Sequence, residues 1–96
     1  MDRNYTETAN HKEYVLLRRL ESANDNDAPK IILALNLLRL RYQSGKGQTE
    51  VAKCLGINQK NLSQWEQGDI APSLRYLIAL AKFYGVTIDQ LLTPIV

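Results

Sequence analysis

The chain has 96 residues, 45% of them apolar, which is enough for one modest hydrophobic core and excludes a large multidomain protein. Its formal net charge is +2, made up of −1 over residues 1–30 and +3 over residues 31–96. The single cysteine, Cys54, excludes an internal disulfide, and the single histidine, His11, has no neighbours at metal-ligand spacing, so we expect no metal and no cofactor. Because no apolar run could span a bilayer and no signal peptide is present, we expect a cytoplasmic chain that makes no membrane contact.

One helix is predicted in the first third of the chain. Residues 1–10 lack apolar periodicity and are expected to form a mobile arm. Over residues 11–21, apolar side chains recur at helical spacing: Tyr14, Leu17 and Leu20, with Val15 and Leu16 widening the stripe. The polar segment 22–29 breaks this helix. We therefore divide the chain into residues 1–28, an arm with a short amphipathic helix, and residues 29–96, the main domain.

The helix predicted over residues 29–43 is apolar on more than one face. Its inward face is expected to hold Ile31, Ile32, Leu35, Leu38 and Tyr42. Three more leucines then lie on the other faces: Leu33, Leu37 and Leu40. This excess predicts a second contact surface, covered either by the segment around Leu17 or by a second subunit.

Residues 48–68 predict two short helices joined by a tight corner. The first runs from about Gln48 to Leu55 and ends at Gly56, where the chain needs a residue that tolerates positive φ. Asn58 is a good N-cap for the second helix. Two helices joined at a steep angle by a short turn with glycine are the arrangement of DNA-binding helix-turn-helix motifs.

The second helix of this pair has two unlike faces. Leu62 and Trp65 share one face, and the indole is expected in the core rather than stacked on a base. The other face carries amides, a hydroxyl and an ammonium group, but no carboxylate: Gln59, Lys60, Ser63, Gln64 and Gln67. Amides pair with adenine edges and lysine with guanine acceptors, whereas a solvated face usually mixes Glu with Lys. The pattern favours a duplex-reading surface over a polar surface without a partner.

Two further helices complete an all-α chain. One is expected over residues 74–84, where Gly85 ends it. The other follows a capping box of Thr87 and Gln90 and ends near residues 92–93, before Pro94. The sequence contains no strand pattern and no internal repeat.

From about Ile31 to Leu92, roughly two-thirds of its length, the chain resembles the phage-repressor/Cro (XRE-type) helix-turn-helix family. The matching residues are Arg41, Gln48, Ala52, Gly56, Leu62, Trp65, Glu66 and Gly68, and the run LIALAKFYGVTIDQLL follows them. The resemblance implies a five-helix lambda-repressor-like bundle, here with an extra N-terminal amphipathic helix. Two positions depart from the family pattern, with Lys46 in place of an apolar residue and Gly47 in place of Ser or Thr.

The resemblance also implies roles for individual residues. The base-reading set is Gln59, Lys60 and Gln64, with Ser63 nearby. The DNA backbone would be met by Gln48, Asn58 and Asn61, and by Lys46 unless its ammonium group is simply solvated. Arg41 would form an ion pair with Glu66 inside the domain, which disfavours the alternative that Glu66 accepts a hydrogen bond from cytosine.

The leading hypothesis is a sequence-specific transcriptional regulator that binds double-stranded DNA. It would be a homodimeric repressor of a phage, plasmid or mobile element, acting on a pseudo-palindromic operator. The alternative is a protein-interaction module, antitoxin-like or partner-binding, that uses the N-terminal segment or the helix over residues 29–43. Candidate dimer surfaces are the tail LLTPIV and the helix around Leu17, although both could pack within the chain. An enzyme is not expected, because no Ser/His/Asp set, phosphate loop or pair of carboxylates is present.

Overall fold

The computed structural model describes the backbone of residues 3–94 and the side chains of residues 11–94. Its helices are α1 (Arg3–Glu21), α2 (Ala28–Ser44), α3 (Gln48–Leu55), α4 (Gln59–Gln67), α5 (Leu74–Tyr84) and α6 (Ile88–Leu92). The described part of the chain contains no strand, and an extra N-terminal helix precedes a five-helix bundle. The predicted fold class is therefore confirmed.

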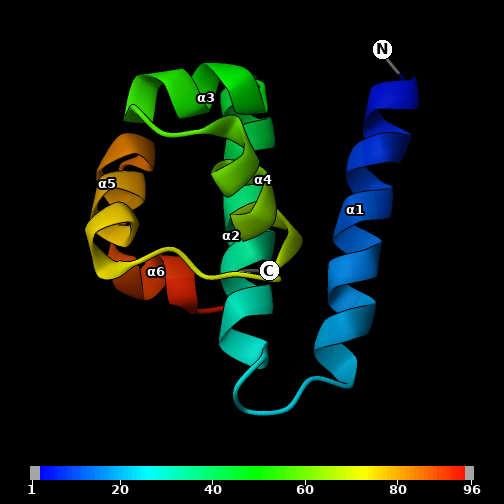
Figure 1. The fold of residues 1–96 in the computed structure, drawn as a ribbon. Helices are drawn as coiled ribbons and strands as arrows, with labels where there is room; N and C mark the ends of the chain where they lie inside the picture. Colours follow the sequence, from blue (N-terminus) through cyan, green and yellow to red (C-terminus); the bar gives the residue numbers. More distant parts are fainter. Residues whose placement is uncertain (1–2, 95–96) are drawn as a thin grey trace.

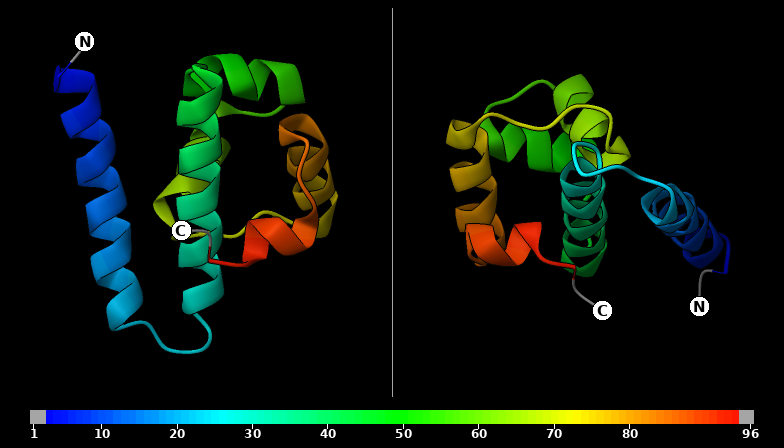
Figure 2. Two further views of the ribbon diagram at one scale, coloured as in Figure 1. Left: turned by 180° about the vertical axis from the view of Figure 1, so that it is seen from behind. Right: turned by 90° about the horizontal axis from the view of Figure 1, so that it is seen from below.

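Helix α2 is the central element of the molecule. Helix α1 runs antiparallel beside it on one side, whereas α5 and α6 lie on the other side (Figures 1 and 2). Helix α3 crosses α2 near its C-terminal end, and α4 packs along α2. The longest apolar helix is therefore covered from both sides by the rest of the chain.

The two sides of α2 belong to two separate clusters of buried side chains. Leu33 and Leu37 enter the main core, whose other members come from α3 to α6: Val51, Ala52, Leu62, Trp65, Leu80, Ala81 and Leu91. Ile31, Leu35 and Leu38 instead form a second cluster with Leu16 of α1. The predicted assignment of faces was wrong, because the side expected to enter the main core packs against α1. Apolar residues surround most of α2, so periodicity alone does not say which side meets which partner.

Helix α1 covers α2, which was one of the two predicted alternatives. It begins at Arg3, eight residues before the expected start, so the arm predicted over residues 1–10 is helical from Arg3 onward; Met1 and Asp2 lie outside the described residues. Leu16 is the buried contact, with Leu20 and Ala23 packed around it. Three members of the predicted stripe are exposed instead: Tyr14 at 54%, Val15 at 41% and Leu17 at 41%.

Local capping signals place the helix ends in the second half of the chain. Gly56 ends α3 with φ 67°, a left-handed conformation that glycine adopts without a Cβ clash. The side chain of Asn58 accepts a hydrogen bond from the Lys60 amide at 2.7 Å, and thereby caps α4. Thr87 and Gln90 form the predicted capping box at the start of α6. Gly56 and Asn58 together set the direction in which α4 leaves the turn.

Asn36 is a buried polar residue in the middle of α2. Its side-chain amide donates to the carbonyls of Leu91 at 2.8 Å and Thr93 at 2.9 Å. Carbonyls at a helix C-terminus have no partner within their own helix, so this amide satisfies groups that would otherwise be buried without one. Asn36 thereby fixes the end of α6 against α2.

Candidate nucleic-acid interface

The helix pair α3–α4 exposes one side of α4 and buries the other. Leu62 and Trp65 enter the main core, and the Trp65 ring lies 5.5 Å from the ring of Tyr76. Trp65 is therefore a core residue and has no surface left for stacking on a base. Anchoring by these two side chains turns the opposite, polar side of α4 outward.

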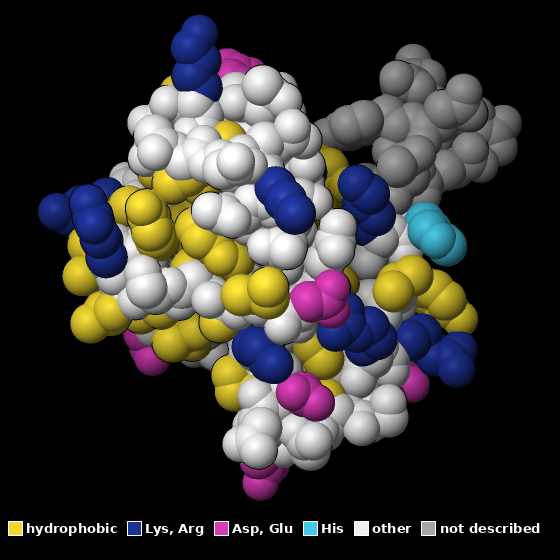
Figure 3. Space-filling view, in the orientation of Figure 1, with side chains coloured by type: hydrophobic (Ala, Val, Ile, Leu, Met, Phe, Trp, Pro, Cys, Tyr) yellow, Lys and Arg dark blue, Asp and Glu magenta, His cyan; other side chains and the backbone are white. Residues whose placement is uncertain are grey.

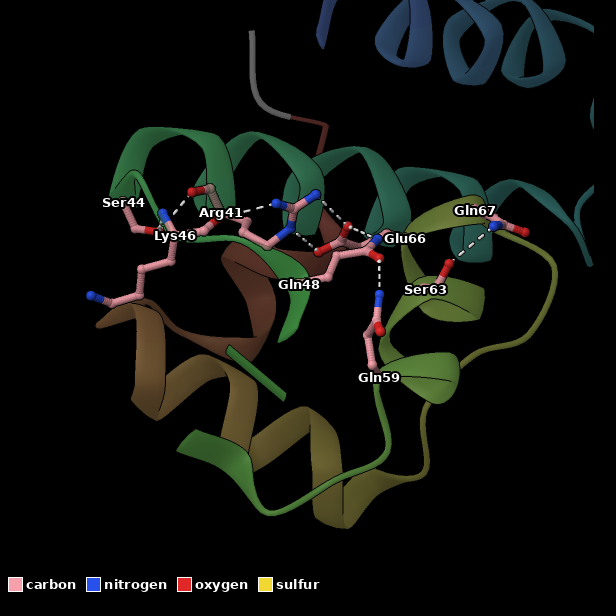
Figure 4. A network of polar contacts seen from close by, with 8 residues as sticks. All are labelled: Arg41, Ser44, Lys46, Gln48, Gln59, Ser63, Glu66 and Gln67. Atoms are coloured by element: carbon pink, nitrogen blue, oxygen red, sulfur yellow. Dashed lines mark hydrogen bonds and ion pairs between the residues drawn. The ribbon is translucent and has the colours of Figure 1, made fainter. Parts of the chain in front are cut away.

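A buried ion pair joins α2 to α4 beneath this polar side. The Nε of Arg41 donates to Oε2 of Glu66 at 2.7 Å, and its Nη2 donates to Oε1 at 2.9 Å (Figure 4). Only 7% of the Arg41 side chain and 2% of the Glu66 side chain are exposed. Arg41 also donates from Nη1 to the carbonyl of Lys46 at 3.1 Å. Glu66 faces inward in this arrangement and is not available to a base.

Electrostatics keep the ion pair in its charged form. Burial is the largest single influence on Arg41 and lowers its pKa, but the hydrogen bonds to Glu66 and the charge of Glu66 together outweigh burial. The net result is a raised Arg41 pKa, so the guanidinium stays protonated. A bidentate pair of this kind fixes both distance and orientation between α2 and α4.

Two glutamines extend this pair to the surface. Gln48, the first residue of α3, donates from Nε2 to Oε1 of Glu66 at 2.9 Å. Gln59, the first residue of α4, donates from Nε2 to Oε1 of Gln48 at 3.2 Å. The chain of contacts runs from the buried guanidinium to an exposed amide, as Figure 4 shows. The N-termini of α3 and α4 are thereby held together.

The remaining predicted site residues lie on or beside the outer side of α4. Gln59, Lys60 and Asn61 are exposed, whereas Ser63 and Gln64 are half-buried. Gln67 donates to the Ser63 hydroxyl at 3.1 Å. Lys46 lies apart from this set, at the N-terminal end of α3, and its ammonium is 3.8 Å from a carboxylate oxygen of Glu50. The side chains of Lys46 and Glu50 are 39% and 58% exposed, so solvent screens the contact and it contributes little energy.

Sequence reasoning missed one residue that bears on this surface. Arg19 of α1 donates from Nη1 to the carbonyl of Gln67 at 2.5 Å and from Nη2 to the carboxylate of Asp69 at 3.3 Å. It therefore holds the C-terminal end of α4 from outside the helix-turn-helix pair. The partners are 48 to 50 positions apart, and no local sequence pattern marks such a contact.

Two absences hold for the described residues. No group of three His, Cys, Asp or Glu side chains comes together there in a way that could bind a metal ion. Nor does any described helix combine the length and the apolar character needed to cross a membrane.

A bundle with a capped helix pair, one helix of which is anchored inward by Leu62 and Trp65, defines a helix-turn-helix domain of the lambda-repressor type. The family model described as helix-turn-helix matches residues 35–91 of this chain. The chain belongs to this XRE-type helix-turn-helix family, whose members bind double-stranded DNA and regulate transcription.

Curated relatives are similar to part of the chain. The HTH-type transcriptional activator BcrR of Enterococcus faecalis is 35% identical over 59% of this chain, and the cryptic phage CTXphi transcriptional repressor RstR of Vibrio cholerae is 37% identical over 56%. These matches span only 28% and 49% of the length of BcrR and RstR. The uncharacterized HTH-type transcriptional regulator y4dJ of Sinorhizobium fredii is 36% identical over 66% of this chain and 82% of its own length. No solved structure matches the chain.

Proposed function

We propose that this transcriptional regulator reads a specific duplex sequence with the outer side of α4. The observation that carries the proposal is the composition of that side, which offers amide, hydroxyl and ammonium groups without a carboxylate: Gln59, Lys60, Ser63 and Gln64. Such groups can donate to and accept from base edges, and none of them repels the phosphates that border the groove.

The contacts of Gln59 and Gln64 leave the atoms required for base pairing available. Gln59 uses one of its two N–H groups on Gln48 and keeps the other N–H and its carbonyl oxygen. One donor and one acceptor on the same amide are what an adenine edge requires. Among the described residues, none is hydrogen-bonded to the Gln64 amide or to the Lys60 ammonium. Lys60 is thus open to guanine acceptors or to a phosphate.

Gln48, Asn58 and Asn61 are proposed to contact the DNA backbone, with Lys46 as a further cation at the edge of the site. Gln48 is braced by Glu66, and Asn58 uses only its side-chain oxygen in capping α4, so its amide N–H groups remain for a phosphate. Contacts of this kind set the register of α4 on the duplex without reading sequence.

The chain is further proposed to act as a homodimer on a pseudo-palindromic operator, with half-sites about 34 Å apart. Exposed apolar side chains support an interface between two copies of the chain. Tyr14 and Leu17 are exposed on α1, and Leu92 is exposed on α6. The last two residues of the tail LLTPIV lie outside the described residues. Light scattering on Leu17→Glu and Leu92→Glu variants would identify the surface, because only the substitution at the interface should yield a monomer.

Repression by occlusion is the proposed outcome of operator binding, in the cytoplasm and on a phage, plasmid or mobile element. Similarity to RstR, which is named as a phage repressor, supports this choice, whereas BcrR is named as an activator. A reporter whose promoter overlaps the selected operator separates the two outcomes. Repression predicts lower expression when the regulator is present, and higher expression would overturn it.

Selection of binding sites from a random duplex pool tests the proposed function directly. A specific regulator should enrich one sequence with two-fold symmetry. An alternative is a protein-interaction module, which the apolar exposure of α1 and of Leu74 on α5 would serve. That alternative predicts no enrichment, no salt-dependent duplex binding and stable association with a protein partner.

A further inference from the structure

Helix α1 is a fixed part of the molecule on the side where α4 is exposed. Leu16 is buried against α2, and the carboxylate of Glu13 accepts a hydrogen bond from Arg39 Nε at 2.6 Å. Apolar burial and a partly buried ion pair therefore hold the same stretch of α1. The residues that neighbour this stretch have a defined position relative to α4.

Arg19 connects α1 to α4 directly. Its guanidinium lies at the C-terminus of α4, where it meets the carbonyls of Gln67 at 2.5 Å and Gly68 at 3.4 Å. Carbonyls at this end carry partial negative charge and have no partner within the helix, so a cation there is favourable. The position of α1 relative to α4 is therefore fixed by two contacts of α1, one with α2 and one with the C-terminal end of α4.

A cleft of about 330 Å³ lies between α1 and α4. Leu16 and Leu38 are among the residues that line it from the core side, whereas Lys12 of α1 and Ser63 and Gln67 of α4 line its opposite edges. The Ser63 and Gln67 side chains belong to the outer side of α4. Lys12 therefore lies across this cleft from the outer side of α4.

The carboxylates that line this cleft are already paired with cations. Glu66 is paired with Arg41, and Asp69 with Arg19. Lys12 is exposed, and no described residue forms an ion pair with it. Figure 3 shows basic side chains on this face over α1 as well as over the α3–α4 region. An anion in front of the cleft would meet an open ammonium group.

We propose that α1 is a second DNA-contacting element, in which Lys12, with His11 beside it, binds a backbone phosphate that borders the base pairs under α4. The inference rests on the proposed function, namely that α4 enters a major groove. That groove is roughly 12 Å wide and an α-helix with its side chains is about 10–12 Å across, so α4 fills it. An element beside α4 then meets the sugar–phosphate backbone rather than bases. The required partner is a duplex phosphate, and Lys12 supplies the charge.

Salt titrations of duplex binding by the chain of residues 1–96 test this assignment. Loss of one phosphate contact should reduce the slope of log K against log salt by about 0.9. We expect Lys12→Ala to show this reduction and to lose the same factor in affinity on the selected operator and on random duplex, because a phosphate contact carries no sequence information. Lys12→Arg should retain the slope of the unsubstituted chain.

Lys82→Ala is the matched control, because Lys82 is an exposed lysine on α5, on the side of α2 away from α1. Its slope should not change. Equal slopes for Lys12→Ala and the unsubstituted chain would overturn the assignment of α1 and leave base reading by α4 intact. Tighter binding by Lys12→Ala would also overturn it, since α1 would then shield α4. No duplex binding by the unsubstituted chain would remove the proposed function itself.

Discussion

The buried ion pair between Arg41 and Glu66 allows a quantitative test of how α4 is held. Replacing Arg41 with Met leaves the Glu66 carboxylate buried with one remaining donor, the Gln48 amide. Removing one partner of a buried pair typically costs about 3–5 kcal/mol, because the other charge is left without compensation. A domain of this size is stable by roughly 5–14 kcal/mol, so a single substitution should remove a large part of that stability.

The double substitution Arg41→Met with Glu66→Leu should be far milder than either single change. Apolar residues of similar volume avoid the desolvation of two charges, and replacements of this kind are often neutral. We expect the stability losses of the two single variants, added together, to exceed the stability loss of the double variant by several kcal/mol. Urea denaturation followed by circular dichroism gives all four free energies of unfolding needed for the cycle.

The same double variant separates stability from function. It should fold, but Gln48 loses the Glu66 oxygen that holds its amide. Operator affinity should therefore fall while nonspecific salt dependence changes little, since phosphate-binding cations are untouched. Additive losses in the stability cycle, or single losses below about 1 kcal/mol, would refute the view that this pair is a tightly coupled buried contact.

Three further outcomes follow from particular contacts. Burial raises the pKa of Tyr84, and no group among the described residues is hydrogen-bonded to its buried hydroxyl, so Tyr84→Phe should raise stability by about 1 kcal/mol at neutral pH. In the unsubstituted chain the Tyr84 phenol ionises near pH 10 when the chain is unfolded and only at higher pH when it is folded. Stability should therefore fall as the pH rises above about 10. The substitution should lessen this fall, which alkaline melting curves would measure. Leu16→Ala should lower the free energy of unfolding by about 2–5 kcal/mol in urea denaturation, whereas Leu17→Ala, at an exposed position, should lower it by less than about 0.5 kcal/mol. Equal losses would contradict the docking of α1 through Leu16. Gln64→Ala should lower discrimination between operator and random duplex by roughly 1–3 kcal/mol in competition titrations, whereas equal losses on both would count against base reading by Gln64.

Local signals account for the parts of the fold that could be predicted from sequence. Gly56, Asn58 and the Thr87–Gln90 box act on neighbouring backbone groups, so their effect can be read without knowledge of the tertiary structure. The bounds predicted for α3 and α5 agree with the structure for this reason. The polar side of α4 could also be identified from spacing alone, because Leu62 and Trp65 determine which side is buried.

Features that depend on distant partners could not be predicted in this way. A second contact surface on α2 followed from its excess of leucines, but the faces were exchanged, because a helix that is apolar nearly all round has no preferred orientation. Arg19 at the end of α4 and Asn36 at the end of α6 satisfy backbone carbonyls 48 to 57 positions away. Nothing in the residues around Arg19 or Asn36 distinguishes them from ordinary polar positions.

The two-sided burial of α2 bears on how this regulator is produced and dissected. Cutting the chain before Ala28 would strip α1 away and leave Ile31, Leu35 and Leu38 facing water along the length of one helix. A continuous exposed apolar surface of that kind promotes aggregation, and two truncated copies would associate through it. Dimers observed with such fragments would therefore be artefacts of the cut, and assembly is best measured on the intact polypeptide.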